Sequence, residues 1–408
     1  MEQQASRHAL IFIFIAMLVD SIGLGIVLPV TPQLISELTH QGMSDAARWG
    51  GWLFFVFALM QFLCAPLIGN LSDRFGRRPV LIVSLAMLGV DYLITGLAPT
   101  IAWLFVGRLL SGIAGAAYTT ANAYIADVSP PEKRAANFGV ISAAFGIGFV
   151  IGPGIGGLLG HFGPRVPFYV SAGIAFANAL YGLIVLKESL PPERRRTFEL
   201  WRANPLGALI ALKRFPMLIG LFGVTVLMRL GHDANPVIWT YYTMLKFHWT
   251  SAQVGYSLMA VGAMLTLVFS FVTRIVIPRL GEVRSAYLGL MCGAIGFFGY
   301  AFATQGWMLY GWMAVWVLMG LVGPSLNAIM SKEVGPSEQG ELQGALASLG
   351  GLTSVAAPPL LSNLFGYFTS DAAPIYFPGA AFFAAGVFTL LAALLLATAH
   401  RSRPAAAS

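Results

Sequence analysis

Long apolar stretches alternate with short polar segments along the whole chain, which has 408 residues. A bilayer core ~30 Å thick needs about 20 apolar residues for one helical crossing. Charged residues, prolines and glycines divide the sequence into twelve runs of this kind, at residues 9–35, 49–70, 79–98, 101–125, 136–160, 166–187, 216–243, 252–277, 284–303, 307–330, 340–367 and 374–399. The pattern therefore predicts an all-α membrane protein with twelve transmembrane helices, whose even number puts both termini on one side.

The composition of the chain agrees with a membrane location. Hydrophobic residues make up 57% and charged residues 10% of the sequence, and the mean hydropathy is +0.76, which excludes a soluble domain. The net charge is +7, but most of the 24 Lys and Arg residues fall in the loops and tails of one side, and only Arg48, Arg165 and Lys246 fall on the other. We therefore expect both termini in the cytoplasm, a multi-pass protein of a bacterial-type inner membrane, and no nucleic-acid partner.

The sequence contains no pattern typical of a metal site, a disulfide or a catalytic centre. Cys64 and Cys292 lie in apolar runs of separate halves. We therefore expect no metal, no cofactor and no enzymatic activity. Arg7 and His8 precede the first apolar run, and no small-residue cleavage site follows it, so the first helix is expected to be retained and not removed as a signal peptide.

One long polar segment, residues 188–215, divides the chain into halves. It begins with a diproline and a run of three arginines, and its later part is apolar in the middle and basic at its end. That later part is expected either to lie along the inner leaflet as an amphipathic helix or to act as a flexible tether. The predicted organisation is an N-terminal six-helix bundle at 1–187, a cytoplasmic linker at 188–215 and a C-terminal six-helix bundle at 216–408.

A weak internal repeat supports this division. Ser129-Pro130-Pro131-Glu132, followed by Gly152-Pro153, has a counterpart in Gly335-Pro336-Ser337-Glu338, followed by Pro358-Pro359. The two halves therefore look like copies in the same orientation, as expected for parallel bundles that face each other across a central cavity.

The densest charge cluster of the first half runs from Gly69 to Val80, between the second and third apolar runs. Its arginines are expected to hold a tight turn on the cytoplasmic side. The segment matches G-x-L-x-D-R-x-G-R-R at every fixed position, and the chain therefore resembles the major facilitator superfamily, in which this signature joins helices 2 and 3. The resemblance implies a gating loop with a partner at the end of helix 4. The residues concerned are Gly69, Asp73, Arg74, Gly76, Arg77, Arg78 and Asp127.

The fifth apolar run carries a second motif, g-x(8)-G-x(3)-G-P-x(2)-G-G, which begins at Gly139. Small residues three and four positions apart give a flat helix face that another helix can approach closely, and a proline bends the helix. Superfamily members with this pattern are typically antiporters. The motif residues are Gly148, Gly152, Pro153, Gly156 and Gly157.

Ionisable residues within the predicted helices are few, and each needs a partner, a water-filled cavity or a function. Asp20 lies near the middle of helix 1. Asp91 in helix 3 and Arg108 in helix 4 each lie about 13 Å from the turn at Pro99, so we expect them to meet at the same depth. A pair would keep Asp91 ionised, whereas an unpaired carboxyl would suit proton carriage, and a purely structural ion pair remains an alternative.

The seventh predicted helix has its own charged cluster. Arg229, His232 and Asp233 fall within about one turn, Arg229 and Asp233 share a face at i,i+4, and Asn235-Pro236 is expected to weaken the helix. A histidine beside a carboxylate can titrate near neutral pH. The cluster is therefore a second proton site, a substrate anchor or a self-neutralised group.

Polar and aromatic side chains deep in the helices are candidates for the wall of a substrate cavity, although each is also compatible with helix packing. The candidates are Gln61, Tyr118, Asn122, Arg229, Asn235, Trp239 and Gln343.

Within the superfamily the chain is similar to the tetracycline-efflux proton antiporters. The similarity includes the segment from Asp20 to Pro32, Asp91-Tyr92-Leu93, the stretch from Gly107 to Ala116, and Gly255-Tyr256-Ser257-Leu258. It implies that Asp20 and Asp91 are acids on which antiport depends and that Arg108 is linked to proton coupling.

Departures from that family concern the substrate. Tetracycline pumps usually have a histidine in helix 8 and an acid in helix 9, where this chain has Leu265 and Gly293, and the second copy of the gating loop, around Arg274 to Arg284, lacks its Asp. The expected function is proton-coupled efflux of a tetracycline-like or other amphiphilic small molecule by alternating access, by a protein that is monomeric. The alternatives are an exporter of a lipid or metabolite and a solute:proton symporter.

Overall fold

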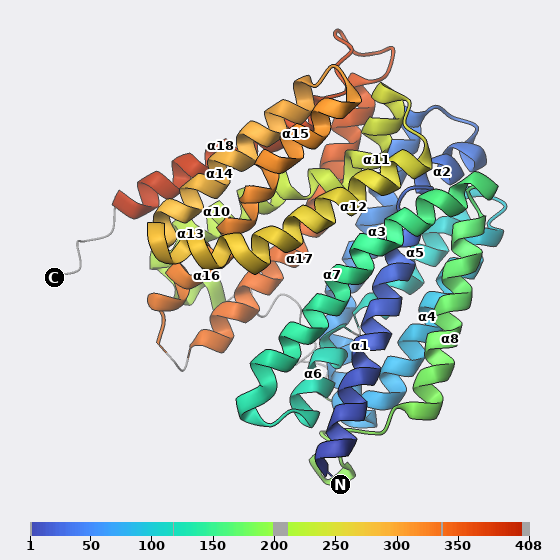
Figure 1. Cartoon of the computed structure of the whole chain (residues 1–408), viewed down its shortest axis with the longest axis vertical. Helices are drawn as coiled ribbons and strands as arrows, with labels where there is room; N and C mark the ends of the chain where they lie inside the picture. The colour runs from blue at the N-terminus through green and yellow to red at the C-terminus, as the bar shows by residue number, and fades with distance from the viewer. Residues whose placement is uncertain (1, 117, 199–210, 336–337, 402–408) are drawn as a thin grey trace. The chain divides into compact units, whose positions relative to one another are not determined.

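The computed structural model describes residues 2–116, 118–198, 211–335 and 338–401. These residues form helices joined by short connections, and no strand occurs among them (Figure 1). The first half contains α1 Glu2–Val27, α2 Thr31–Thr39, α3 Met43–Phe75, α4 Arg77–Leu97, α5 Ile101–Gly115, α6 Tyr118–Val128, α7 Arg134–Leu159 and α8 Val166–Val185. The second half contains α10 Ile219–His232, α11 Ala234–Phe247, α12 Ser251–Leu267, α13 Thr273–Leu280, α14 Glu282–Phe302, α15 Gly306–Trp316, α16 Val322–Lys332, α17 Gln339–Phe368 and α18 Ala380–Arg401.

Eleven spans of the described chain are long and apolar enough to cross a membrane. A twelfth is the bent pair of Ile11–Val27 and Thr31–Thr39, whose axes differ by 47°. Pro29 lies in this bend and Pro32 directly follows it, and proline cannot donate the backbone hydrogen bond that a straight helix needs. The twelve-helix prediction is therefore confirmed, and the spans follow the predicted runs closely.

Two segments differ from the expectation. The charged segment from Gly69 is not an open loop, because α3 continues to Phe75 and only Gly76, with φ +104°, separates it from α4. A single glycine suffices for the reversal because it alone adopts this backbone conformation without strain. The last helix begins at Ala380 and not at residue 374, since Pro374 and Pro378 precede it. The amphipathic helix expected in the linker falls largely on residues 199–210, outside the described residues.

The chain divides into two compact units. Unit 1 comprises Met1–Gln41, Val56–Pro205 and Trp249–Met259, and unit 2 comprises Gly42–Phe55, Leu206–His248 and Ala260–Ser408. These units differ from the predicted bundles by two exchanged segments, the start of α3 and the start of α12. Within unit 2, Gly51 of α3 lies against Ser362 of α17, and within unit 1, Gly157 of α7 lies against Ser251 of α12.

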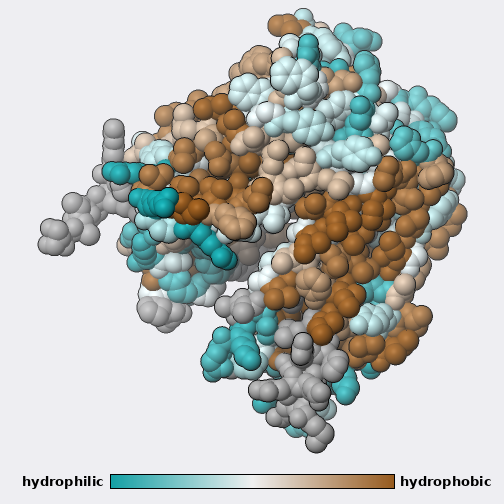
Figure 2. Space-filling model, viewed as in Figure 1, coloured by the Kyte–Doolittle hydropathy of each residue, from teal (hydrophilic) through white to brown (hydrophobic). Residues whose placement is uncertain are grey.

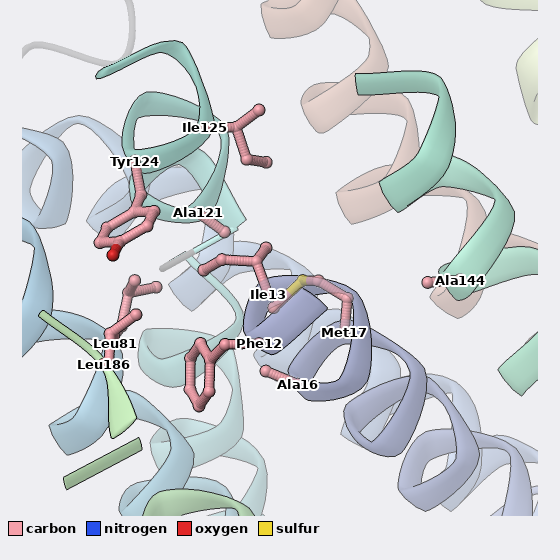
Figure 3. Packing of buried hydrophobic residues seen from close by; sticks show 10 residues of the cluster. All are labelled: Phe12, Ile13, Ala16, Met17, Leu81, Ala121, Tyr124, Ile125, Ala144 and Leu186. Atoms are coloured by element: carbon pink, nitrogen blue, oxygen red, sulfur yellow. The ribbon is translucent and has the colours of Figure 1, made fainter. Parts of the chain in front are cut away.

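Unit 1 is organised by α1, which packs against α7 and α8, and by α4, which packs against α8 and α5. A cluster of buried side chains from α1, α4, α6 and α7, together with Leu186, forms its core (Figure 3). In unit 2, α18 packs against α10 and α14, and α14 packs against α15. The core of unit 2 is rich in aromatic rings from Trp239, Phe297, Tyr300 and Phe382.

The outward faces of the helices are apolar, as a lipid environment requires. Large hydrophobic side chains on α8 are exposed, including Leu180 at 57% and Ile184 at 75%. Figure 2 shows hydrophobic residues over the visible faces of α7, α1 and α8, with hydrophilic residues gathered towards the helix ends. A soluble protein rarely exposes apolar surface of this extent.

Candidate functional site

Arg77, the first residue of α4, is the centre of a charged network at the Gly76 turn. Its side chain is only 11% exposed and forms ion pairs with Asp73 at the end of α3 and with Asp127 of α6, the latter with Nε 3.2 Å from Oδ2. Arg77 Nη1 also donates to Ser72 Oγ at 2.6 Å. The network ties together the ends of three helices, and Asp127 is in contact as the resemblance implied.

Glu188, which the sequence reasoning missed, completes this network from the far end of α8. Its carboxylate accepts hydrogen bonds from the backbone N–H groups of Arg77 at 2.8 Å and Arg78 at 3.2 Å. These donors at the N-terminus of α4 have no partner within the helix, and the negative charge also complements the positive end of the helix dipole. The same carboxylate accepts the backbone N–H of Ser189, whose hydroxyl donates to Asp127 at 3.1 Å. The sequence feature that pointed to Glu188 was its position directly after the sixth predicted helix.

The other residues of the motif lie at the edge of this network. Arg78 Nη2 donates to the carbonyl of Leu183 at 2.7 Å. Arg74 is exposed and lies over the ring of Phe75, 5.1 Å from its centroid. The carbonyl oxygen of Gly69 accepts a hydrogen bond from the hydroxyl of Ser72 at 2.8 Å. Arg77 is therefore the one arginine of the three that joins carboxylates from two helices within the described chain.

Asp91 and Arg108 meet inside unit 1, as their equal distances from the turn predicted. Arg108 Nη2 lies 2.9 Å from Asp91 Oδ2, and the Asp91 side chain is 1% exposed. Thr95 Oγ1 donates a further hydrogen bond to Asp91 Oδ1 at 3.2 Å. The pair is thus desolvated and hydrogen-bonded, the arrangement in which a buried charge is tolerated.

Gly107 makes room for this pair. A Cβ added at Gly107 would overlap Asp91 Oδ1 and would lie 2.9 Å from Thr95 Oγ1. Because Gly107 has no side chain, the carboxylate of Asp91 on α4 can lie against the turn of α5 that carries Arg108.

Asp20 lies half-buried on α1 and lines a small pocket of about 50 Å³. No hydrogen bond or ion pair of its carboxylate occurs among the described residues. The wall comprises Phe12, Ile13, Ala16, Met17, Asp20, Leu81, Ser84, Leu85, Leu88, Ala114, Gly115 and Tyr118. Several of these residues also belong to the core cluster of Figure 3. The wall beside the Asp20 carboxylate is therefore largely apolar.

Tyr92 links the surroundings of the two carboxylates. It is 2% exposed, lies within electrostatic reach of Asp20, Asp91 and Arg108, and its hydroxyl has no hydrogen-bond partner in the described chain. A Cβ on Gly23 of α1 would lie 3.5 Å from that hydroxyl, so the ring fills the space beside α1. No sequence pattern singled out Tyr92 beyond its place next to Asp91.

The glycine motif of α7 faces α1. Added Cβ atoms would lie 2.6 Å from the carbonyl of Leu18 at Gly148 and 2.7 Å from that of Ile22 at Gly152, and Gly156 leaves still less room beside Ile26. The close approach of another helix predicted from the spacing is therefore present. Pro153 contacts two helices, since its ring lies against Gly25 of α1 and its carbonyl against Gly255 of α12. Gly157 faces α12, at Ser251.

The charged cluster of the seventh span differs from the expectation. Helix α10 ends at His232 and α11 begins at Ala234, close to Pro236, as the sequence suggested, but the N–H of Asp233 still donates to the carbonyl of Arg229 at 2.9 Å. The side chains of Arg229 and Asp233 do not form a pair, and no ion pair or hydrogen bond of the Arg229 guanidinium occurs among the described residues. Instead Asp233 Oδ1 lies 3.7 Å from His232 Nδ1, and Asp233 Oδ2 accepts the hydroxyl of Ser354 at 3.5 Å.

The remaining cavity candidates lie in several environments. Tyr118 lines the Asp20 pocket, and Gln61 lies near Gly115 of the same wall. Asn122 is half-buried on α6. Trp239 is 3% exposed and packs within the aromatic core of unit 2, and Gln343 donates to Asn327 Oδ1 at 2.8 Å. No group of three or more potential metal-ligating side chains occurs in the part of the chain that the structure describes.

Comparison with protein families agrees with this architecture. The sequence model of the Major Facilitator Superfamily matches residues 13–358. Among curated proteins, the chain is 38% identical over 360 residues to the class C tetracycline resistance protein of Escherichia coli, covering 88% of this chain and 90% of that protein. It is 28% identical to multidrug resistance protein 2 of Bacillus subtilis, covering 90% and 91%.

Solved structures show the same fold. The nucleoside transporter NupG superimposes with a TM-score of 0.78 at 14% identity, covering 97% of this chain and 100% of that one. The human organic anion transporter MFSD10 superimposes with a TM-score of 0.69 at 22% identity, covering 96% and 99%. At these identities the likeness concerns the fold alone.

Proposed function

Because the chain belongs to the Major Facilitator Superfamily, a family of transporters and not of enzymes, we propose that it exports a tetracycline-like or other amphiphilic small molecule in exchange for protons by alternating access. Its relatives among tetracycline and multidrug resistance proteins favour drug efflux. The proposal includes a cytoplasmic-membrane location with both termini inside, a monomeric protein, and no cofactor besides the proton gradient.

The observation that carries the proposal is the contrast between two carboxylates in unit 1. Asp91 is held by Arg108 and Thr95, whereas Asp20 lines a pocket without a partner among the described residues. Asp20, which is open to a pocket, can bind a proton readily. Asp91 is held by its partners, so its protonation has a structural effect.

Protonation of Asp91 would remove its attraction to Arg108, and the guanidinium would then need another partner. Since these residues lie on α4 and α5, the step would loosen the contact between the two helices. A bound proton can only shift the equilibrium between two conformations by as much as its affinity differs between them. The Asp91–Arg108 pair supplies such a difference, because the pair favours an ionised carboxylate.

The Arg77 network is proposed as the gate of this cycle. It joins α3, α4 and α6 through ion pairs that can break and re-form. The pocket beside Asp20 is proposed as part of the substrate route, because its wall is apolar except for a few polar groups, which is typical of sites for amphiphilic ligands.

The test is export in proteoliposomes with an imposed pH gradient. We expect Asp91→Asn to abolish proton-driven transport while the protein still inserts and purifies, and Asp45→Asn, which changes a half-exposed acid of α3 paired with Arg48, to retain it. Transport by Asp91→Asn at the wild-type rate would exclude Asp91 from coupling. Accumulation in place of export under the same gradient would identify a symporter.

A further inference from the structure

Arg229 is a charged residue within a membrane span. It lies in the span Pro216–Phe247, roughly 20 Å along the helix from Pro216. Its side chain is exposed, and no carboxylate or hydrogen-bond acceptor of the described residues contacts it. A guanidinium at such a depth is costly and ordinarily marks a functional site.

The carboxylate of Asp233 does not serve as a counter-ion for Arg229, although it lies one turn further along the span. The backbone keeps the helical spacing here, since the N–H of Asp233 donates to the carbonyl of Arg229 at 2.9 Å. The Asp233 side chain nevertheless contacts His232 and the hydroxyl of Ser354. The available carboxylate is therefore already engaged, and the positive charge of Arg229 remains uncompensated.

The surroundings of Arg229 hold its guanidinium in place on α17. A methyl group added at Gly350 would lie 3.0 Å from both Cζ and Nη1 of Arg229, so the planar group lies against the glycine. Close by in sequence, Asn235 Nδ2 is buried and has no acceptor among the described residues. The ring centroids of His232 and Trp316 lie 5.7 Å apart, with the ring planes tilted by 32°. Arg229 and Asn235 thus offer donors that lack acceptors.

We propose that Arg229 binds an anionic group of the transported molecule, so that the substrate class is amphiphilic organic anions bearing a carboxylate or sulfonate. The guanidinium offers paired N–H donors that match the two oxygens of such a group. Asn235 Nδ2 supplies a further donor nearby in the chain. This inference rests on the proposed transport function, but it can be tested by binding alone.

The probe is dansylglycine, an amphiphilic carboxylate whose fluorescence is excited by energy transfer from tryptophan, added to the full-length purified protein in detergent without a gradient. Its neutral analogue dansylglycinamide and the cationic dansylcadaverine are the matched ligands. We expect the acid to bind at least tenfold more tightly than the amide, and Arg229→Gln to remove this preference, because charged hydrogen bonds contribute that much. Arg194→Gln, which removes an exposed arginine outside the spans, should leave it unchanged.

Gly350→Ala provides a second variant that keeps the charge of Arg229 and displaces its guanidinium. It should weaken dansylglycine more than dansylglycinamide. The inference is overturned if the wild-type protein does not prefer the acid, or if Arg229→Gln binds it as the wild type does. If the wild-type protein shows no proton-driven transport but still binds dansylglycine more tightly than dansylglycinamide, the proposed function is refuted and the anion site at Arg229 is retained.

Discussion

Glu282 and Lys332 form an ion pair in unit 2, with Lys332 Nζ 2.6 Å from Glu282 Oε1. The pair repeats the Arg77–Asp127 pair of unit 1 with the charges exchanged. Glu282 directly follows Gly281, which has φ +79°, just as Arg77 follows Gly76. Lys332 ends α16, whereas Asp127 lies near the end of α6. The second half has therefore lost the Asp of the loop motif but retains an ion pair at the equivalent place.

This relationship predicts the result of a charge exchange. Glu282→Lys and Lys332→Glu should each lower transport because like charges then face each other, and the double variant should restore much of it. Since Lys332 is 66% exposed, the coupling free energy in a double-mutant cycle should be only about 0.2–1 kcal/mol. Export rates and unfolding midpoints of the four proteins are the measurement. Strictly additive losses would show that the pair does not act as a unit.

Arg77 and Arg74 predict opposite outcomes for the same substitution. Arg77→Gln leaves Asp73 and Asp127 without their buried partner, and we expect it to cost about 1–3 kcal/mol of stability and most of the transport rate. Arg74 is exposed, with its guanidinium over Phe75, so Arg74→Gln should change stability by less than about 0.5 kcal/mol. Thermal unfolding in detergent and vesicle transport report both effects, and equal losses in the two variants would contradict the network.

Tyr92→Phe tests whether the buried hydroxyl serves packing or function. Because the Oη atom has no partner in the described chain, removing it relieves an unsatisfied polar group, and stability should stay equal or rise by about 1 kcal/mol. A fall in the unfolding midpoint would show that the hydroxyl makes a stabilising bond in solution. A stable variant with altered pH dependence of transport would place Tyr92 between Asp20 and Asp91 in proton coupling.

Different parts of the molecule were predictable to different degrees. The spans, a close helix contact at the glycine face of α7 and the meeting of Asp91 with Arg108 follow from apolar run length, glycine spacing and distance from a turn, which are local properties. Glu188 and Tyr92 were missed because their contacts join segments distant in sequence. The contact of the Asp233 carboxylate with Ser354 could not be predicted either, because the two residues lie 121 positions apart in the sequence.

The glycine face of α7 predicts the largest effect of a single methyl group. Gly156→Ala would place a Cβ into the carbonyl of Ile26 on α1, and backbone atoms cannot move aside as a flexible side chain can. We expect the free energy of unfolding to fall by about 1–3 kcal/mol, which is typical of overpacking, and transport to be lost. Gly139→Ala on the same helix meets nothing within 4 Å and should be neutral or slightly stabilising because alanine favours helix formation. Unfolding midpoints of both variants decide the matter: a Gly156→Ala protein as stable as Gly139→Ala would mean that α1 and α7 do not pack as closely as the structure has them.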